Sequence, residues 1–95
     1  MLYALICTDK PHAQDLRAAT REDHLAYLKA MGDKLKAAGP FLDDHGGMTG
    51  SLVVIEAENR DEALAIAGED PYARAGLFET VEIRPWNWVI NNPEA

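Results

Sequence analysis

The chain of 95 residues contains a single cysteine, Cys7. One thiol cannot form an internal disulfide, which fits a protein of the reducing cytoplasm. Because Cys7 lies within the apolar run of residues 2–8, we interpret it as a buried, inert thiol and not as a nucleophile.

Long hydrophobic runs and basic residues are also scarce. No segment approaches the roughly 20 apolar residues of a membrane-spanning helix, and the first residues do not resemble a signal peptide. We therefore expect a cytoplasmic protein. Only 9 residues are Lys or Arg against 16 Asp or Glu, so the formal net charge is −7. This excess of acid and the lack of a basic patch argue against nucleic acid or an anionic membrane as the main partner.

Signals for metals and cofactors are weak. The spacing Asp43-Asp44-His45 has no metal-site signature, and adding His12 and His24 does not create one. The stretch "GGMTGS" resembles a small nest of backbone N–H groups, but it lacks the lysine and the following helix of a phosphate loop. We therefore expect no metal and no cofactor.

Apolar residues make up 47% of the chain, which is ordinary for one globular domain covering residues 1–95. A domain of this size has a thin core, and a partner subunit would add to it. The hydrophobic pattern predicts six elements. They are a strand at 2–8, a helix capped by Thr20 and ending at 39–40, a short strand at 40–44, a strand at 51–57, a helix capped by Asn59 or Asp61 that ends at Gly68, and a strand at 77–84.

The order β-α-β-β-α-β is that of the ferredoxin-like α+β fold with a four-stranded antiparallel sheet. Right-handed crossovers place the first and third strands in the centre of this sheet, and these two strands are apolar on both faces. Two helices cover only one face. We therefore expect a homodimer in which the sheet of a second copy covers the other face.

Asp70 raises a question of its own, because it follows the C-terminal end of a predicted helix, where the helix dipole repels a carboxylate. The predicted topology brings three segments to one end of the sheet: residues 20–24, 43–51 and 68–76. His24 and Asp70 are then neighbours. A carboxylate that accepts a hydrogen bond from one imidazole nitrogen fixes the tautomer and leaves the other nitrogen as a base. We expect His24 in the first helical turn, where the dipole favours the neutral ring.

A structural interpretation stands beside this one. Asp-Pro often opens a turn, and a histidine in a first helical turn is often only a surface residue. The pattern of residues alone leaves both interpretations of His24 and Asp70 open.

Several stretches together resemble the YciI-like (YCII-related) proteins over nearly the whole chain: "MLYALICTD", "TREDHLAYLKAMGDKLKAAGP", "TGS" and above all "DPYARAGLFETVEIRPW". The resemblance implies a dimeric α+β barrel of ferredoxin-like protomers. It also implies that His24 and Asp70 form a proposed catalytic pair, that Ser51 lines the same cleft and that Tyr72 forms a wall of it.

These observations predict a small cofactor-independent enzyme that acts on a small polar or aromatic molecule. In this hypothesis His24 is the general acid or base, Asp70 orients it, and Ser51 or loop backbone groups bind a substrate oxygen. Proton abstraction, isomerisation and lyase-type elimination all suit one base without a cofactor. Two alternatives remain. One is a non-catalytic dimeric ligand-binding or accessory module in which His24 and Asp70 only tie the first helix to the turn, and the other is a cofactor-independent monooxygenase. The sequence does not name the substrate.

Overall fold

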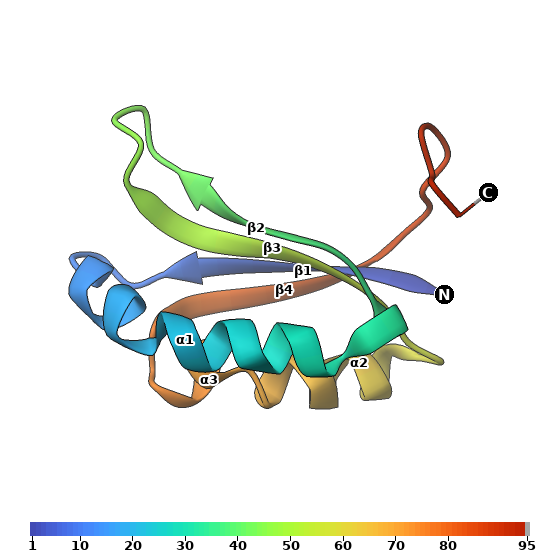
Figure 1. Ribbon diagram of the computed structural model, residues 1–95, viewed down its shortest axis with the longest axis horizontal. Coiled ribbons are helices and arrows are strands. Elements are labelled where there is room, and N and C mark those ends of the chain that lie inside the picture. The colour runs from blue at the N-terminus through green and yellow to red at the C-terminus, as the bar shows by residue number, and fades with distance from the viewer. Residues whose placement is uncertain (95) are drawn as a thin grey trace.

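The computed structural model describes residues 1–94 and consists of one antiparallel sheet with helices on one of its faces (Figure 1). The expected ferredoxin-like order of strands and helices is confirmed, with one short helix added before the last strand. The elements are β1 (Leu2–Asp9), α1 (Gln14–Ala30), the 3-10 turn Gly32–Lys34, β2 (Leu35–Leu42), β3 (Met48–Glu56), α2 (Arg60–Gly68), α3 (Pro71–Arg74) and β4 (Phe78–Trp86).

The strand order is β2-β3-β1-β4, so the two strands with the most apolar sequences are central, as predicted. In β1 every second side chain is buried beneath the helices, because successive side chains point to opposite faces of a strand. Residues of both central strands join side chains of α1, α2 and β4 in one core. That core contains Tyr3, Leu5, Cys7, Leu28, Val53, Ile55, Ala57, Ala63 and Ile83.

The opposite face of the sheet has no helix over it (Figure 1). Apolar side chains from the central strands, including Ile6 and Leu52, line a shallow hollow there together with Trp86 of β4. The β2–β3 hairpin and the residues after β4 both rise on this side (Figure 1). One protomer therefore leaves a largely apolar sheet face uncovered.

The first helix begins and ends earlier than predicted. It starts at Gln14 and not after Thr20, whose hydroxyl donates a hydrogen bond to the Leu16 carbonyl inside the helix. It ends before Gly32, which adopts a φ of +58° that favours glycine. Residues 35–38, which we assigned to the helix, begin β2 instead.

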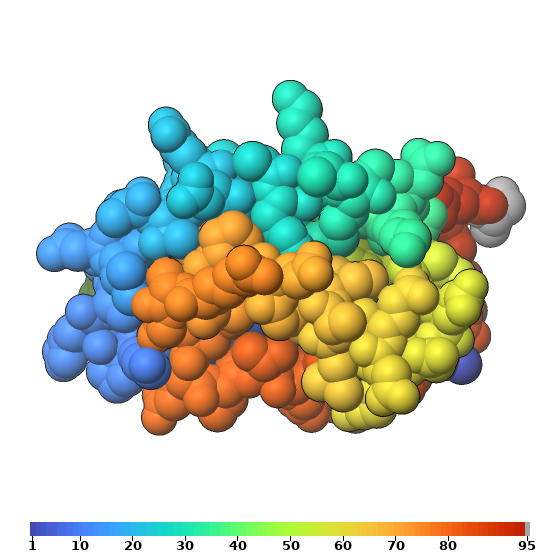
Figure 2. Space-filling view, turned by 90° about the horizontal axis from the view of Figure 1, so that it is seen from below, coloured from blue at the N-terminus to red at the C-terminus, as the bar shows by residue number. Residues whose placement is uncertain are grey.

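The second helix agrees more closely with the prediction. Asn59 caps α2 by accepting a hydrogen bond from the Glu62 amide at 2.9 Å. The turn that follows contains the additional helix α3. Figure 2 shows the segment around α3 packed directly against α1 on the helical side of the molecule. This packing brings the two halves of the chain together.

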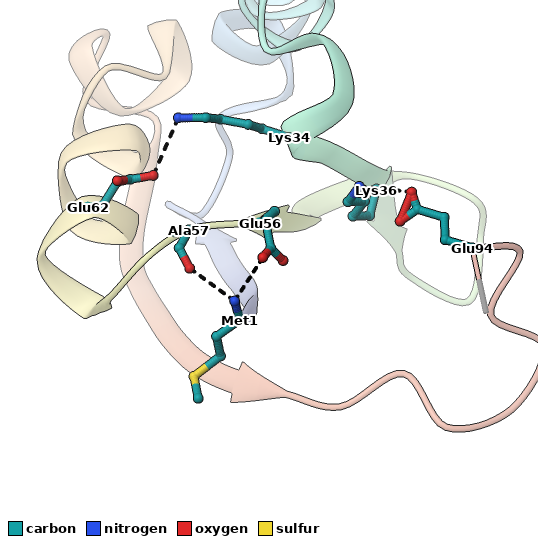
Figure 3. Close-up of polar contacts among 7 residues, drawn as sticks. All are labelled: Met1, Lys34, Lys36, Glu56, Ala57, Glu62 and Glu94. Carbon is teal, nitrogen blue, oxygen red and sulfur yellow. Dashed lines mark hydrogen bonds and ion pairs between the residues drawn. The ribbon is translucent and has the colours of Figure 1, made fainter.

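Exposed hydrogen bonds and ion pairs connect the chain segments at the end of the sheet where β1 begins (Figure 3). The N-terminal amine donates to Glu56 at 2.9 Å and to the Ala57 carbonyl at 3.2 Å. Lys36 of β2 pairs with Glu94 at 2.8 Å and so holds the C-terminal segment. Within residues 1–94, no helix is both long and apolar enough to cross a membrane.

Candidate active site

The centre of the site is a histidine and an aspartate that lie 46 positions apart in the sequence. Nδ1 of His24 lies 2.9 Å from Oδ1 of Asp70, and both side chains are buried. Their predicted proximity is confirmed. The predicted position of His24 in a first helical turn is wrong, because α1 starts ten residues earlier, at Gln14. The helix dipole therefore does not determine the state of this imidazole.

Asp70 has a second role that explains its position after α2. It is the N-cap of α3, and the same Oδ1 accepts a hydrogen bond from the Tyr72 amide at 2.9 Å. The dipole of a helix stabilises a carboxylate at its start, so the attraction from α3 opposes the repulsion from the C-terminal end of α2. The last turn of α2 is itself held to α1, because the Tyr27 hydroxyl donates to the Ile66 carbonyl at 2.5 Å.

A second buried pair, which we did not anticipate, lies beside the first. Nε and Nη2 of Arg17 donate to the two carboxylate oxygens of Asp9 at 2.7 and 2.9 Å. Nη2 also donates to Oγ of Ser51 at 2.9 Å. Burial alone would lower the pKa of Arg17, but the hydrogen bonds and charge of Asp9 outweigh it and raise that pKa. Arg17 thus fixes the hydroxyl of Ser51.

The position of Ser51 depends on a glycine next to it. A side chain at Gly50 would place its Cβ 2.2 Å from the carbonyl oxygen of Cys7 on β1, so only glycine fits. This close approach lets β3 pair with β1 so that Ser51 lies opposite Cys7. Ser51 is therefore presented from a central strand.

Tyr72 connects the two pairs. Its ring stacks on the imidazole of His24 at a centroid distance of 4.0 Å, and the guanidinium of Arg17 lies 4.5 Å from the same ring. Two residues seven apart on a helix are about 10.5 Å apart along its axis, so the ring lies between them. Burial raises the pKa of Tyr72, and the charges of Arg17 and Arg21 oppose the rise.

Nε2 of His24 remains available for chemistry. It makes no hydrogen bond to residues 1–94, yet no completely buried side-chain nitrogen or oxygen in this part of the chain lacks a partner. Nε2 is therefore not completely buried, although His24 as a whole is only 7% exposed. His24 lines a pocket between α1 and the β2–β3 pair, and the pair is not sealed under apolar side chains.

This pocket has a volume of about 140 Å³. Arg17, Arg21, His24, Leu25 and Leu28 reach it from α1 because their spacing places them on one helical face. The two remaining predicted site residues, Ser51 and Tyr72, line it as well. All four predicted residues thus meet in one place. The rest of the lining comes mainly from β2 and β3: Ala38, Gly39, Pro40, Met48 and Val53.

A larger hollow of about 580 Å³ lies beside it, between the β1–α1 connection and the β2–β3 hairpin. His12 and Asp43 line it, but the Asp43 carboxylate is occupied by the amides of His45 and Gly47. Over residues 1–94, His, Cys, Asp and Glu do not gather in threes as a metal site requires. We therefore place the candidate site in the smaller pocket.

Comparison with known protein families agrees with the resemblance noted in the sequence. Residues 1–87 match the YCII-related domain. Two similar relatives are the protein YciI of Escherichia coli, 38% identical, and an uncharacterised protein of Haemophilus influenzae, 37% identical. In each case the match covers 95% of this chain and 100% of the relative.

Solved structures give the same fold. The 5-chloro-2-hydroxyhydroquinone dehydrochlorinase TftG of Burkholderia phenoliruptrix, solved in complex with 2,5-dihydroxybenzoquinone, is 33% identical with a TM-score of 0.86. The match covers 97% of this chain and 99% of TftG. A NIPSNAP family protein of Agrobacterium tumefaciens is 19% identical with a TM-score of 0.57 over 97% of this chain and 95% of its own, and it shows the fold alone.

Proposed function

Because this chain belongs to the YCII-related family, we propose that it is an enzyme that uses His24 for acid–base chemistry on a small hydroxylated ring. The observation that carries this proposal is the hydrogen bonding of the two imidazole nitrogens of His24. Its Nδ1 is held by Asp70, and its side chain lines a pocket that the free Nε2 would serve. A base within reach of a ligand and oriented by a third group is the arrangement that proton transfer requires.

The size of the pocket favours a single ring. A cavity of about 150 Å³ holds one benzene molecule, and this pocket measures about 140 Å³. Leu25, Leu28 and Val53 supply apolar walls, whereas His24 and Ser51 supply polar groups. Apolar walls with a few convergent polar groups are typical of small-molecule sites.

We infer an elimination that needs no outside oxidant. One hydroxyl proton moves through Nε2 of His24 to the ring carbon that bears the leaving group. That group then departs with its bonding electron pair, and a second hydroxyl proton is released to solvent. The hydroxylated ring becomes a quinone, and the electrons balance within the substrate. The similarity to TftG, named as a dehydrochlorinase, supports this reaction class.

The other residues would bind and orient the ring. Oγ of Ser51 accepts a hydrogen bond from Arg17, so the Ser51 O–H would donate to a ring oxygen. Tyr72 stacks on His24 and limits its rotation. Asp70 accepts a hydrogen bond from Nδ1–H of His24 and stabilises the imidazolium that forms when Nε2 takes up a proton.

The test is turnover of chlorinated hydroxyhydroquinones, followed by chloride release and by quinone absorbance. We expect the wild-type protein to release chloride and quinone in equal amounts. His24→Asn should lower kcat by about 10²-fold or more, the usual contribution of a general acid–base group. His45→Asn is the matched control, because His45 is an exposed histidine outside the pocket.

Equal rates for the His24→Asn and His45→Asn proteins would contradict the proposal. A wild-type protein that binds the rings but releases no chloride would instead favour a non-catalytic binding module.

A further inference from the structure

One arginine at the pocket has no ion-pair partner. The guanidinium of Arg17 pairs with Asp9, and the imidazole of His24 is hydrogen-bonded to Asp70. Arg21, an exposed residue one helical turn from Arg17, also lines the pocket. Within residues 1–94, no carboxylate lies within ion-pair distance of Arg21. Arg21 is therefore a cation at the pocket that has no ion-pair partner within residues 1–94, in a chain whose formal net charge is −7.

Donors gather around the same spot. Asp9 and Ser51 occupy Nε and Nη2 of Arg17, so Nη1 is the nitrogen left to contact Tyr72 or a ligand. Tyr72 is only 2% exposed, and its hydroxyl lies close enough to Arg17 for a side-chain hydrogen bond. The charges of Arg17 and Arg21 both act on this hydroxyl. All three residues line the pocket, so one ligand bound there can contact them all.

We propose that the pocket is selective for a ring that carries one anionic oxygen substituent, and that Arg21 is the residue that recognises this charge. A phenolate, an enolate or a carboxylate would accept hydrogen bonds from Arg17 and from the O–H of Tyr72 and would face the guanidinium of Arg21. Charge-assisted hydrogen bonds of this kind are about twice as strong as neutral ones. A neutral ring of the same shape would leave the charge of Arg21 unmatched.

The inference rests on the proposed function only in treating this pocket as the substrate site, so it is tested by binding and not by turnover. Benzoate and benzamide have nearly the same shape, but only benzoate is charged at neutral pH. Isothermal titration calorimetry with each compound would give both dissociation constants. We expect benzoate to bind about tenfold more tightly, or better, since hydrogen bonds to charged groups are worth that much.

Arg21→Gln should remove this preference by weakening benzoate about tenfold while leaving benzamide unchanged. Arg60→Gln is the matched control, because Arg60 is an exposed arginine at the start of α2, away from the pocket, and its loss changes the net charge equally. The control should bind both ligands as the wild type does. Added salt should weaken benzoate more than benzamide.

Three results would overturn the inference: equal affinities for the two ligands, equal effects of the two arginine substitutions, or no benzoate binding at millimolar concentration. The outcome is separable from that of the proposed function. An Arg21-dependent preference for benzoate without any turnover would sustain the inference and refute the reaction. Turnover without a preference for benzoate would refute the inference and sustain the proposed reaction.

Discussion

The imidazole of His24 stacks on the ring of Tyr72, with centroids 4.0 Å apart and planes 19° apart. The amide of Tyr72 donates to the same oxygen of Asp70 that lies 2.9 Å from His24. One short turn, Asp70 to Tyr72, therefore supplies both the hydrogen-bond partner and the stacking surface of the imidazole. The orientation of His24 depends on that turn being formed.

Substitutions of Asp70 separate its two roles. Asp70→Asn keeps an oxygen that can cap α3, so we expect a change in melting temperature of only a few degrees. Activity should fall by about 10²-fold, because the amide cannot stabilise an imidazolium as a carboxylate does. Asp70→Ala should lose the cap as well, at about 1 kcal/mol, or roughly 4–8 °C for a domain of this size. Thermal unfolding and turnover of both variants would check this. An Asp70→Asn protein as unstable as Asp70→Ala, with unchanged activity, would indicate a purely structural pair.

Arg17 and Asp9 should be strongly coupled. Both side chains are almost fully buried, 6% and 5% exposed, so removing one partner leaves a buried charge without compensation. We expect Arg17→Ala to lower the free energy of unfolding by about 3–5 kcal/mol. The double variant Arg17→Ala, Asp9→Ala should be less destabilised than the sum of the two single variants, as measured by urea unfolding of all four proteins. Additive effects would show that the two residues act independently.

The helix that presents the site was the hardest element to predict, and the reason is physical. The inward face of its first half carries the buried polar residues Arg17 and His24, so an apolar stripe does not mark it. Leu35 and Ala38 happen to continue the helical spacing of Leu28, although they belong to β2. The glycine at position 32, with its positive φ, was the signal that the helix had ended.

The pair of His24 and Asp70 was predictable in spite of this error, because it depends on topology more than on helix boundaries. The apolar sequences of β1 and β3 fixed the central strands, and right-handed connections then placed α1 beside the turn after α2. Arg17 and Asp9 were not predictable. Their pairing follows from the short connection between β1 and α1. No pattern of residues in that stretch predicted where α1 begins.

Stability should decrease at alkaline pH. Burial, with the nearby charge of Asp70 adding to it, raises the pKa of Cys7 from 9.0 to about 12, and burial also raises the pKa of Tyr27. The folded chain therefore keeps protons that the unfolded chain releases, and unfolding becomes easier as pH rises from about 9 towards 12. Urea unfolding at a series of pH values should show this decline, and Cys7→Ala should make it shallower. A midpoint that stays constant over this range would contradict the expected burial of these groups.

We propose that the uncovered sheet face binds a second copy of the chain. A stable interface of this kind buries about 1,200–2,000 Å². Leu52→Glu places a charge on that face and should give a monomer in light scattering at micromolar concentration. Leu64→Glu is the control, because Leu64 is an exposed leucine on α2, on the helical side, and this variant should behave as the wild type. A wild-type protein that is monomeric would refute the proposal.

The most direct test of the proposed site is a crystal structure of this protein with 2,5-dihydroxybenzoquinone. Our account predicts the ring in the pocket between α1 and β3, with one oxygen about 2.6–3.2 Å from Nε2 of His24 and another near Oγ of Ser51. A ring bound in the larger hollow beside His12, or one that leaves Nε2 without a contact, would contradict it.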